Sequence, residues 1–205
     1  MLFRSGGVGS DVMIGFFGDD TYIVNGENSS VIEEANGGTD LVYTSISFVL
    51  GADSEVETLS TITHASTDAI DLTGSSTGQT VVGNAGSNVL DGKGGNDLLA
   101  GLGGEDTFAF TSALGAGNVD TLFDFSVDDD TIALDDAIFT ELGAALDAGE
   151  FVIGTAALDA DDRIIYDSAT GALFYDADGL GGAAAVQFAT LTPGLALTVS
   201  DFAVI

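Results

Sequence analysis

Basic residues are almost missing from this sequence of 205 residues, which has three lysines and arginines against 33 aspartates and glutamates and a formal net charge of −30. Binding to nucleic acid depends on Lys and Arg that neutralise phosphates, and anionic membrane surfaces attract the same side chains. The shortage excludes a nucleic-acid-binding protein and leaves no basic patch for an anionic lipid surface. Disordered chains also combine high charge with few aromatic residues, but 45% hydrophobic residues in a regular pattern favour a folded domain here.

Cysteine is absent and histidine occurs once, as His64. The lack of cysteine is compatible with any compartment, so it does not locate the protein. A single histidine excludes a zinc site with several histidine ligands, including the H-E-x-x-H motif, within this chain. We therefore expect no enzyme activity here, and we interpret His64 as a surface residue of a strand or loop.

The sequence also lacks a hydrophobic run long enough to span a membrane. Residues 183–199 are the most apolar region, but Gln187, Pro193 and Gly194 interrupt them, and the pattern alternates as it does in strands. We expect no membrane span, and no signal peptide precedes the first glycines. We interpret residues 1–5 as a non-native or truncated start.

Glycine, by contrast, is abundant, and in two stretches it recurs in units of nine residues. Each unit starts with glycine and has glycine at position 4, Asn or Asp at position 6 and a large apolar residue at position 8. A fixed short period predicts a solenoid, and the glycines allow a tight turn in every unit. A carboxylate beside carbonyls freed by such a turn is a ligand set suited to Ca²⁺. The units are GGVGSDVMI (6–14), GFFGDDTYI (15–23), GNAGSNVLD (83–91), GKGGNDLLA (92–100) and GLGGEDTFA (101–109).

The apolar residues at position 8 continue beyond the glycine units. Residues 65–73 and 74–82 keep this residue although they have lost the glycine loop. We predict that the whole series points inward and forms a thin core. Its members are Met13, Tyr22, Val31, Leu72, Val81, Leu90, Leu99 and Phe108.

The pattern G-G-x-G-x-D, repeated in this way, resembles the RTX or hemolysin-type calcium-binding repeat. The resemblance implies an all-β fold, a parallel β-roll in which positions 1–6 form a loop, positions 7–9 form a strand and two units make one turn. It also implies Ca²⁺ between stacked loops, held by the position-6 side chain and by carbonyls near positions 2 and 4. The implied ligands are Gly7, Gly9, Asp11, Gly18, Asp20, Asn84, Gly86, Asn88, Lys93, Gly95, Asp97, Leu102, Gly104 and Asp106.

The same resemblance places Asn88 and Asp106 on one side of the roll and Asp97 on the other. Position 2 is glycine only at Gly7, and a left-handed backbone is harder for the larger residues found there in the other units. Asn88 in place of an aspartate removes one negative charge from its site. We therefore expect two to four occupied sites rather than one per unit.

Three regions follow the start of the chain. We interpret residues 6–64 as the first repeat pair with a strand-rich spacer, residues 65–118 as the main roll and residues 119–205 as a C-terminal cap. The spacer contains a predicted strand at 40–48, where β-branched and aromatic residues alternate. A cap is expected because an open solenoid must cover its last sheet edges.

The cap is predicted to be rich in strands and to contain one short helix. Ile138, Leu142 and Leu146 fall on one face of a helix predicted within residues 135–149. Residues 163–176 predict a hairpin with a glycine-containing loop. Two further strands are predicted at 184–191 and 195–205.

Two short acidic motifs in the C-terminal third could each bind an ion. Residues 176–179, Asp-Ala-Asp-Gly, resemble the start of an EF-hand loop, but the later ligands are missing and a plain β-turn is the preferred interpretation. Residues 128–130 are three aspartates, which we interpret as a solvated turn rather than an ion site at the edge of the roll.

The end of the chain carries further resemblances. Residues 119–134 resemble the segment that follows the repeats in serralysin-type C-terminal domains. Residues 200–205, an acidic residue followed by apolar ones, resemble the signals read by type I secretion machinery. These resemblances imply a bacterial protein that is secreted, meets that machinery during export and is monomeric outside the cell.

The sequence thus predicts calcium binding and calcium-induced folding of the C-terminal region of an exported protein. Two alternatives concern the parent protein. The chain could be a structural segment of an RTX adhesin or surface-layer protein, or the non-catalytic tail of a secreted serralysin-like metalloprotease. The first alternative predicts more repeats upstream, and the second predicts a catalytic domain there.

Overall fold

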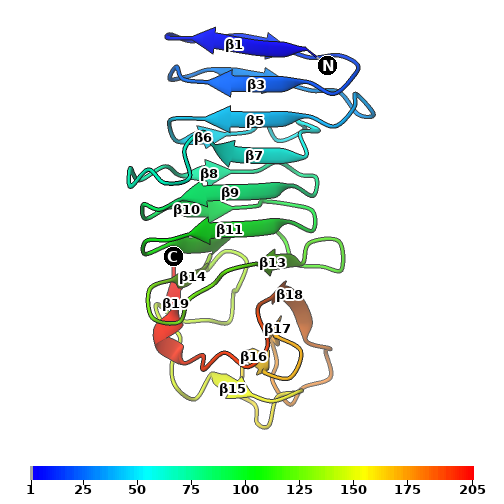
Figure 1. Cartoon of the computed structure of the whole chain (residues 1–205). Coiled ribbons are helices and arrows are strands. Elements are labelled where there is room, and N and C mark those ends of the chain that lie inside the picture. Colours follow the sequence, from blue (N-terminus) through cyan, green and yellow to red (C-terminus); the bar gives the residue numbers. More distant parts are fainter. Residues whose placement is uncertain (1) are drawn as a thin grey trace.

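A computed structural model describes residues 2–205 and shows an almost entirely β protein in which most strands pair in parallel. The chain winds back and forth between two faces from β1 at the N-terminal end to a cap at the other end (Figure 1). This confirms the predicted all-β class and its parallel, roll-like arrangement.

The larger sheet has eleven strands in the order β1-β3-β5-β7-β9-β11-β13-β18-β17-β16-β15. Its first seven strands pair in parallel and form one face of the roll. They are β1 (Phe3–Gly7), β3 (Thr21–Val24), β5 (Leu41–Thr44), β7 (Thr58–Thr61), β9 (Thr80–Asn84), β11 (Leu98–Leu102) and β13 (Asp120–Leu122).

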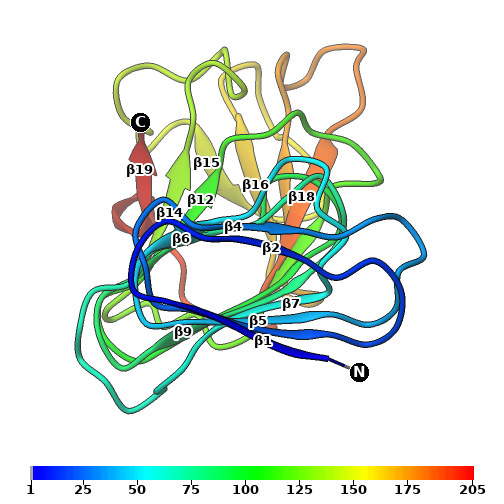
Figure 2. The same cartoon turned by 90° about the horizontal axis from the view of Figure 1, so that it is seen from above.

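The opposite face consists of a six-stranded sheet, in the order β19-β14-β12-β10-β8-β6, and a two-stranded sheet, β2-β4. Viewed along the roll, β2, β4 and β6 lie across from β1, β5, β7 and β9 (Figure 2). The strands of this face are β2 (Val12–Ile14), β4 (Ser30–Ile32), β6 (Phe48–Val49), β8 (Leu72–Thr73), β10 (Val89–Asp91), β12 (Thr107–Phe110), β14 (Thr131–Leu134) and β19 (Phe202–Val204).

The strand register follows the nine-residue period. Leu90 lies opposite both Leu72 and Phe108, and Leu99 lies opposite Val81. Two units therefore make one turn of the roll. As predicted, Asn88 and Asp106 precede strands of the six-stranded sheet, whereas Asp97 precedes β11 in the larger one.

The core lies between the two faces and includes the position-8 side chains. All eight members of the predicted series are buried, and five of them in the main roll, from Leu72 to Phe108, have no exposed surface. Burying such a side chain stabilises the fold by about 1.5–3 kcal/mol. Phe108 also contacts Phe125, with 5.9 Å between the ring centroids.

The predicted strand at 40–48 is wrong in one respect, because it forms two strands on different faces. β5 ends at Thr44 and β6 begins at Phe48. Between them the Thr44 hydroxyl donates to the carbonyl of Ile46 (2.7 Å), and the Ile46 N–H returns a bond of 3.2 Å to that hydroxyl. This local bonding turns the corner of the roll, which an alternating pattern does not reveal.

The predicted helix within residues 135–149 is also wrong. The N–H groups of Ile138 and Phe139 both bond to the Asp135 carbonyl, so only a single turn forms before the chain becomes irregular. Leu142 and Leu146 are buried nevertheless. Tertiary burial therefore explains their spacing. The one helix in residues 2–205 is a 3-10 turn at Val199–Asp201.

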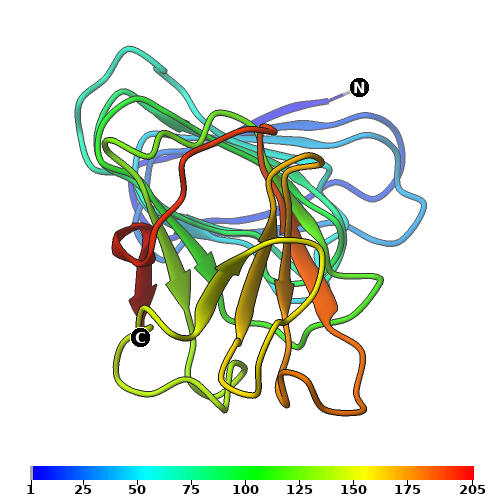
Figure 3. The same ribbon diagram turned by 90° about the horizontal axis from the view of Figure 1, so that it is seen from below.

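A four-stranded extension of the larger sheet caps the lower end of the roll (Figures 1 and 3). β16 and β17 form the predicted hairpin, β18 pairs in parallel with β13, and β19 pairs with β14. The cap is thereby joined to both faces. The strands predicted at 184–191 and 195–205 are shorter than expected, since only β18 and β19 form there. The extension contains β15 (Phe151–Ile153), β16 (Ile164–Asp167), β17 (Ala172–Tyr175) and β18 (Val186–Thr190).

Candidate metal centres

Four of the five glycine units share one loop conformation. Positions 2 and 4 both have a left-handed backbone, with φ between 66 and 114°. Phe16, Lys93 and Leu102 adopt it at position 2 although each has a Cβ, at a cost of roughly 1 kcal/mol or more. The four pairs are Gly7 and Gly9, Phe16 and Gly18, Lys93 and Gly95, and Leu102 and Gly104. In these four units the loop shape is therefore kept even where position 2 carries a side chain.

The glycine at position 1 leaves room for the carboxylate at position 6 of the same unit. A Cβ added to Gly92 or Gly101 would collide with Oδ2 of Asp97 or Asp106, respectively. At Gly6 the added Cβ would lie 2.6 Å from the carboxylate of that unit. Each carboxylate thus folds back over the start of its own loop.

The glycine at position 4 lets loops of successive turns approach each other. A Cβ on Gly104 would lie 2.7 Å from the carbonyl carbon of Gly86, and one on Gly95 would lie 2.5 Å from that of Thr77. Side chains at these positions would separate the loops. Stacked loops are the arrangement in which one ion can contact two turns.

The position-6 side chains form a ladder along each face of the roll. In each pair, one carboxylate oxygen accepts a backbone N–H from the turn before it. The donor is the position-6 residue of that earlier turn, directly before its strand. The bonds measured from N to Oδ1 are Gln79 to Asp97 (2.6 Å), Asn88 to Asp106 (2.8 Å), Asp97 to Asp120 (3.0 Å), Asp106 to Asp130 (3.0 Å) and Asp20 to Asp40 (2.8 Å).

In four of the position-6 carboxylates, one oxygen is buried and has no hydrogen-bond partner. This holds for Oδ2 of Asp11, Asp20, Asp40 and Asp97. The side chains of Asp20, Asp40 and Asp97 are at most 3% exposed. A buried charge without a partner costs several kcal/mol, whereas a coordinated divalent cation would satisfy it. The donor set therefore fits a metal ion bound at oxygen ligands.

The electrostatics of the ladder agree with this geometry. Burial raises the pKa of Asp106 to about 6, and repulsion by Asp130 and Asp124 adds to the effect. Burial likewise raises the pKa values of Asp97, Asp120 and Asp130. Without a cation, these side chains hold protons more tightly than ordinary aspartates, because their charges are desolvated and close together.

The loop of residues 83–91 has a different shape from the other four. Asn84 and Gly86 are outside the left-handed region, and amide groups close the loop instead. Oδ1 of Asn88 accepts the Asn84 N–H at 2.8 Å, and Oδ1 of Asn84 accepts the Gly86 N–H at 2.8 Å. The predicted ligands Asn84, Gly86 and Asn88 thus lie together in a loop that their own hydrogen bonds already satisfy.

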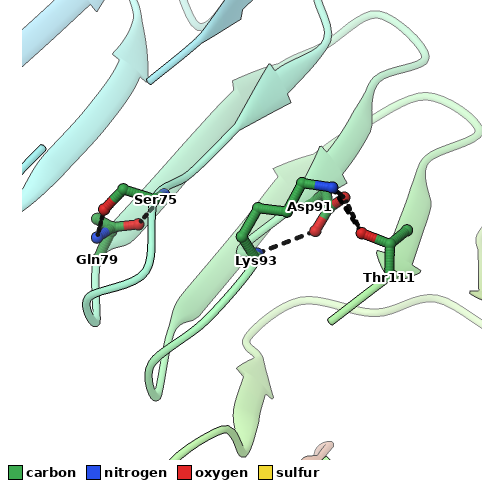
Figure 4. Close-up of polar contacts among 5 residues, drawn as sticks. All are labelled: Ser75, Gln79, Asp91, Lys93 and Thr111. Atoms are coloured by element: carbon green, nitrogen blue, oxygen red, sulfur yellow. Dashed lines mark hydrogen bonds and ion pairs between the residues drawn. The ribbon is translucent and has the colours of Figure 1, made fainter. Parts of the chain in front are cut away.

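Polar side chains on the neighbouring loops are paired within the protein (Figure 4). The Lys93 ammonium lies 2.9 Å from Asp91 Oδ2 and 2.7 Å from the Thr111 hydroxyl, so it neutralises a carboxylate outside the ladder. In the degenerate unit 74–82, Gln79 stands at position 6 and its Oε1 accepts the Ser75 N–H at 2.9 Å. A neutral amide therefore closes this loop without an ion.

Sequence reasoning missed four members of the ladder: Asp40, Glu57, Asp120 and Asp130. One signal was available, because Asp20, Asp106, Asp120 and Asp130 each precede a threonine and an inward apolar residue. Asp40 belongs to a unit, residues 35–43, that lacks the first glycine but has a left-handed Asn36 at position 2 (φ 63°). Asp130 is buried, while Asp128 and Asp129 are exposed, so only part of that acidic run is the predicted solvated turn.

Two other motifs lie outside the ladder. Residues 74–78, Gly-Ser-Ser-Thr-Gly, match the G-x-S-x-G pattern of hydrolase nucleophiles, but they form a loop between β8 and β9 with no helix after it. His64 is an exposed turn residue, as predicted, and lies 3.0 Å from the Ser60 hydroxyl. Residues 176–179 form a bend with Gly179 at φ 60°, which agrees with the interpretation as a turn.

No protein-family model and no curated protein sequence matches this chain. Among the residues that the structure describes, no helix is long and apolar enough to cross a membrane.

Proposed function

We propose that this chain binds Ca²⁺ in the stacked loops of a β-roll and that binding drives its folding. One observation carries the proposal: in loops of one repeated conformation, Asp20, Asp97 and Asp106 are buried, and Asp11, Asp20 and Asp97 each have a buried carboxylate oxygen without a hydrogen-bond partner. In this proposal the ion supplies the positive charge that the ladder lacks. The ligands would be these carboxylates, Asp106 and the loop carbonyls at positions 2 and 4.

The chemistry of the donor set favours calcium over other ions. The loops offer carboxylates and backbone carbonyls, the sequence has no cysteine, and the ring of its single histidine, His64, is paired with the Ser60 hydroxyl. Hard oxygen ligands suit Ca²⁺ and Mg²⁺, and several protein oxygens with flexible geometry favour Ca²⁺. Among residues 2–205, no backbone N–H donates to the carbonyls of Phe16, Lys93 or Gly95, which leaves these oxygens for an ion.

The charge of the chain links ion binding to folding. At a net charge of −30, the compact state is destabilised by its own repulsion, and the ladder concentrates that repulsion inside the roll. A cation that binds only the folded state adds its binding free energy to folding stability. The chain is therefore proposed to be largely unfolded without calcium and ordered with it.

This linkage supports a role in an exported protein, as the RTX and serralysin-type resemblances imply. The C-terminal segment that resembles a type I signal contains β19, which pairs with β14 in the folded roll. Low calcium inside a bacterium would keep this segment free for the secretion machinery, and calcium outside would fold it. The activity of the parent protein, as an adhesin or as a protease, would lie upstream.

The experiment is a calcium titration of the full chain from chelator, followed by far-ultraviolet circular dichroism, with magnesium as the control ion. The wild type should gain β signal with calcium and not with magnesium. Asp97→Ala combined with Asp106→Ala should shift the midpoint at least tenfold. The matched control, Asp53→Ala with Asp136→Ala, removes the same charge from exposed positions and should leave the midpoint nearly unchanged. Equal midpoints for the two double variants would refute the proposal.

A further inference from the structure

Building on the proposed calcium binding of the roll, we propose that Glu33 joins the ladder carboxylates Asp20 and Asp40 in one divalent-cation site that links the two faces of the N-terminal turn. One carboxylate oxygen from each residue lies within 4.8 Å of the other two. Asp20 precedes β3, Asp40 precedes β5, and Glu33 follows β4 on the opposite face. Two of these three residues lie outside the nine-residue units with the full glycine pattern.

All three carboxylates are held by one oxygen and leave the other without a partner. Asp20 Oδ1 accepts the Leu2 N–H, Asp40 Oδ1 accepts the Asp20 N–H, and Glu33 Oε1 accepts the Tyr22 hydroxyl. Asp20 Oδ2, Glu33 Oε2 and Asp40 Oδ2 are buried and unpaired. The residues are only 1%, 4% and 1% exposed. Each carboxylate is thus fixed by a hydrogen bond to one oxygen, and its other oxygen is left for an ion.

Glu33 lies beside the first glycine of the unit 15–23, where other units have their own position-6 aspartate. In the units that start at Gly92 and Gly101, the first glycine faces the position-6 aspartate of its own unit. At Gly15 the added Cβ would instead collide with Glu33 Oε1 and the Tyr22 hydroxyl. Glu33 therefore enters the loop of residues 15–23 from the opposite face and adds a carboxylate to Asp20.

Within the described residues 2–205, the three carboxylates have no ion-pair partner. No ion pair within 4.0 Å involves these three carboxylates among residues 2–205, where the one ion pair is Lys93 with Asp91. Arg4 is close enough to influence Glu33 electrostatically, but its guanidinium bonds to the carbonyl of Gly15 (3.4 Å). Burial raises the pKa values of Glu33 and Asp40, which is the expected response of crowded, desolvated acids without a cation.

The ligand class follows from the donors and their spacing. Three carboxylate oxygens without sulfur or nitrogen suit a hard cation. A Cβ added to Gly37 would lie 2.9 Å from the Phe16 carbonyl oxygen and 3.4 Å from Glu33 Oε2, so a carbonyl faces the same space. A cage of several protein carboxylate and carbonyl oxygens with flexible geometry suits Ca²⁺, whereas Mg²⁺ usually keeps several waters and binds through one or two carboxylates. The site is therefore assigned to Ca²⁺.

Terbium, which replaces Ca²⁺ at oxygen sites and luminesces when a nearby tyrosine is excited, is a suitable probe. Tyr22 is bonded to Glu33, and the chain has no tryptophan. Full-length chain titrated with Tb³⁺ should show luminescence that Ca²⁺ displaces. Glu33→Gln keeps the hydrogen-bond acceptor for Tyr22. It should raise the Tb³⁺ concentration at half-maximal luminescence roughly tenfold or more, since the affinity of calcium sites depends on ligand charge. The control Glu34→Gln alters an exposed neighbour and should match the wild type.

Two further measurements separate this site from the main roll. Asp97→Ala with Asp106→Ala should keep the luminescence if the N-terminal site is independent of those loops. Calorimetric titration of Glu33→Gln with Ca²⁺ should show about one site fewer than Glu34→Gln. Luminescence and site number that are the same in Glu33→Gln and Glu34→Gln would overturn the assignment, even if the roll itself binds calcium. A Glu33→Gln chain that fails to order at saturating calcium, while Glu34→Gln orders, would support it.

Discussion

Acidification should stabilise the calcium-free roll, opposite to its effect on the calcium-loaded one. The buried Asp106 has a pKa of about 6 in the fold, compared with 3.8 for an ordinary aspartate. Because its folded pKa is the higher one, the folded state binds more protons than the unfolded state between these two values. Stability without calcium must therefore fall as the pH rises from about 4 to about 6 and stay low above it.

The magnitude follows from the size of the shift. A difference of roughly two pKa units corresponds to about 3 kcal/mol, since each unit is worth about 1.4 kcal/mol. Burial also raises the pKa values of Asp97, Asp120 and Asp130, so these residues lower the calcium-free stability in the same direction as the pH rises. A loss of at least about 3 kcal/mol between pH 4 and pH 7 is therefore expected in chelator.

The assay is urea unfolding followed by circular dichroism, at several pH values from 4.5 to 8, in chelator and in saturating calcium. A chain that is unfolded at pH 7 in chelator should recover β signal at pH 5. In calcium the dependence should reverse below about pH 6, because protons and the ion compete for the same oxygens. Asp106→Asn should remove about 3 kcal/mol of the pH dependence in chelator. A calcium-free stability that rises from pH 5 to pH 7 would refute the reasoning.

Three further predictions concern single positions. Phe108→Ala should destabilise the calcium-loaded roll by about 3–5 kcal/mol in urea unfolding, because the ring is fully buried, whereas the exposed Phe123→Ala should change it little. Gly92→Ala should weaken calcium binding in calorimetry, since the new Cβ collides with the position-6 carboxylate, while Gly103→Ala meets open space and should bind normally. Leu102→Gly should raise the unfolding free energy by about 1 kcal/mol, because Leu102 has a φ of 77°; an unchanged or lower value would contradict the assigned strain.

The repeating architecture was predictable because its nine-residue period can be read directly from the sequence. Leu72, Leu90 and Phe108 recur at fixed intervals, and a fixed interval determines both the register of the strands and the side that each residue faces. The resemblance to the RTX repeat, in which two units make one turn, correctly placed Asp97 and Asp106 on opposite faces. The spacing thus predicted a solenoid with inward apolar residues, and the resemblance added which face each unit occupies.

The wrong or missing predictions concern residues whose positions do not follow from the nine-residue period. In the cap, Leu142 and Leu146 have helical spacing but are buried by an irregular segment, because neighbouring strands supply the apolar surface. Glu33 gave no signal as a ligand because its approach to Asp20 depends on how β4 crosses to the other face. Such a meeting of residues from opposite faces is a property of the tertiary structure, and one repeat unit does not contain it.

The carboxylate ladder of the larger sheet is interrupted in the middle of the roll, and under the proposed function this would divide the molecule's response to calcium. The Asp40 N–H bonds to Glu57, but the next residue in line, Gln79, is neutral and bonds within its own loop. Leu59 and Val81 pack across this boundary with no exposed surface, so apolar contact holds it. Since each turn of a solenoid contacts only its neighbours, the proposed calcium binding would give the protein two ion-dependent ends, separated by a segment in which this sheet has no ladder carboxylate; we refer to this segment as the waist. At intermediate calcium one end could be ordered while the other is not, and the waist would mark where cooperativity breaks.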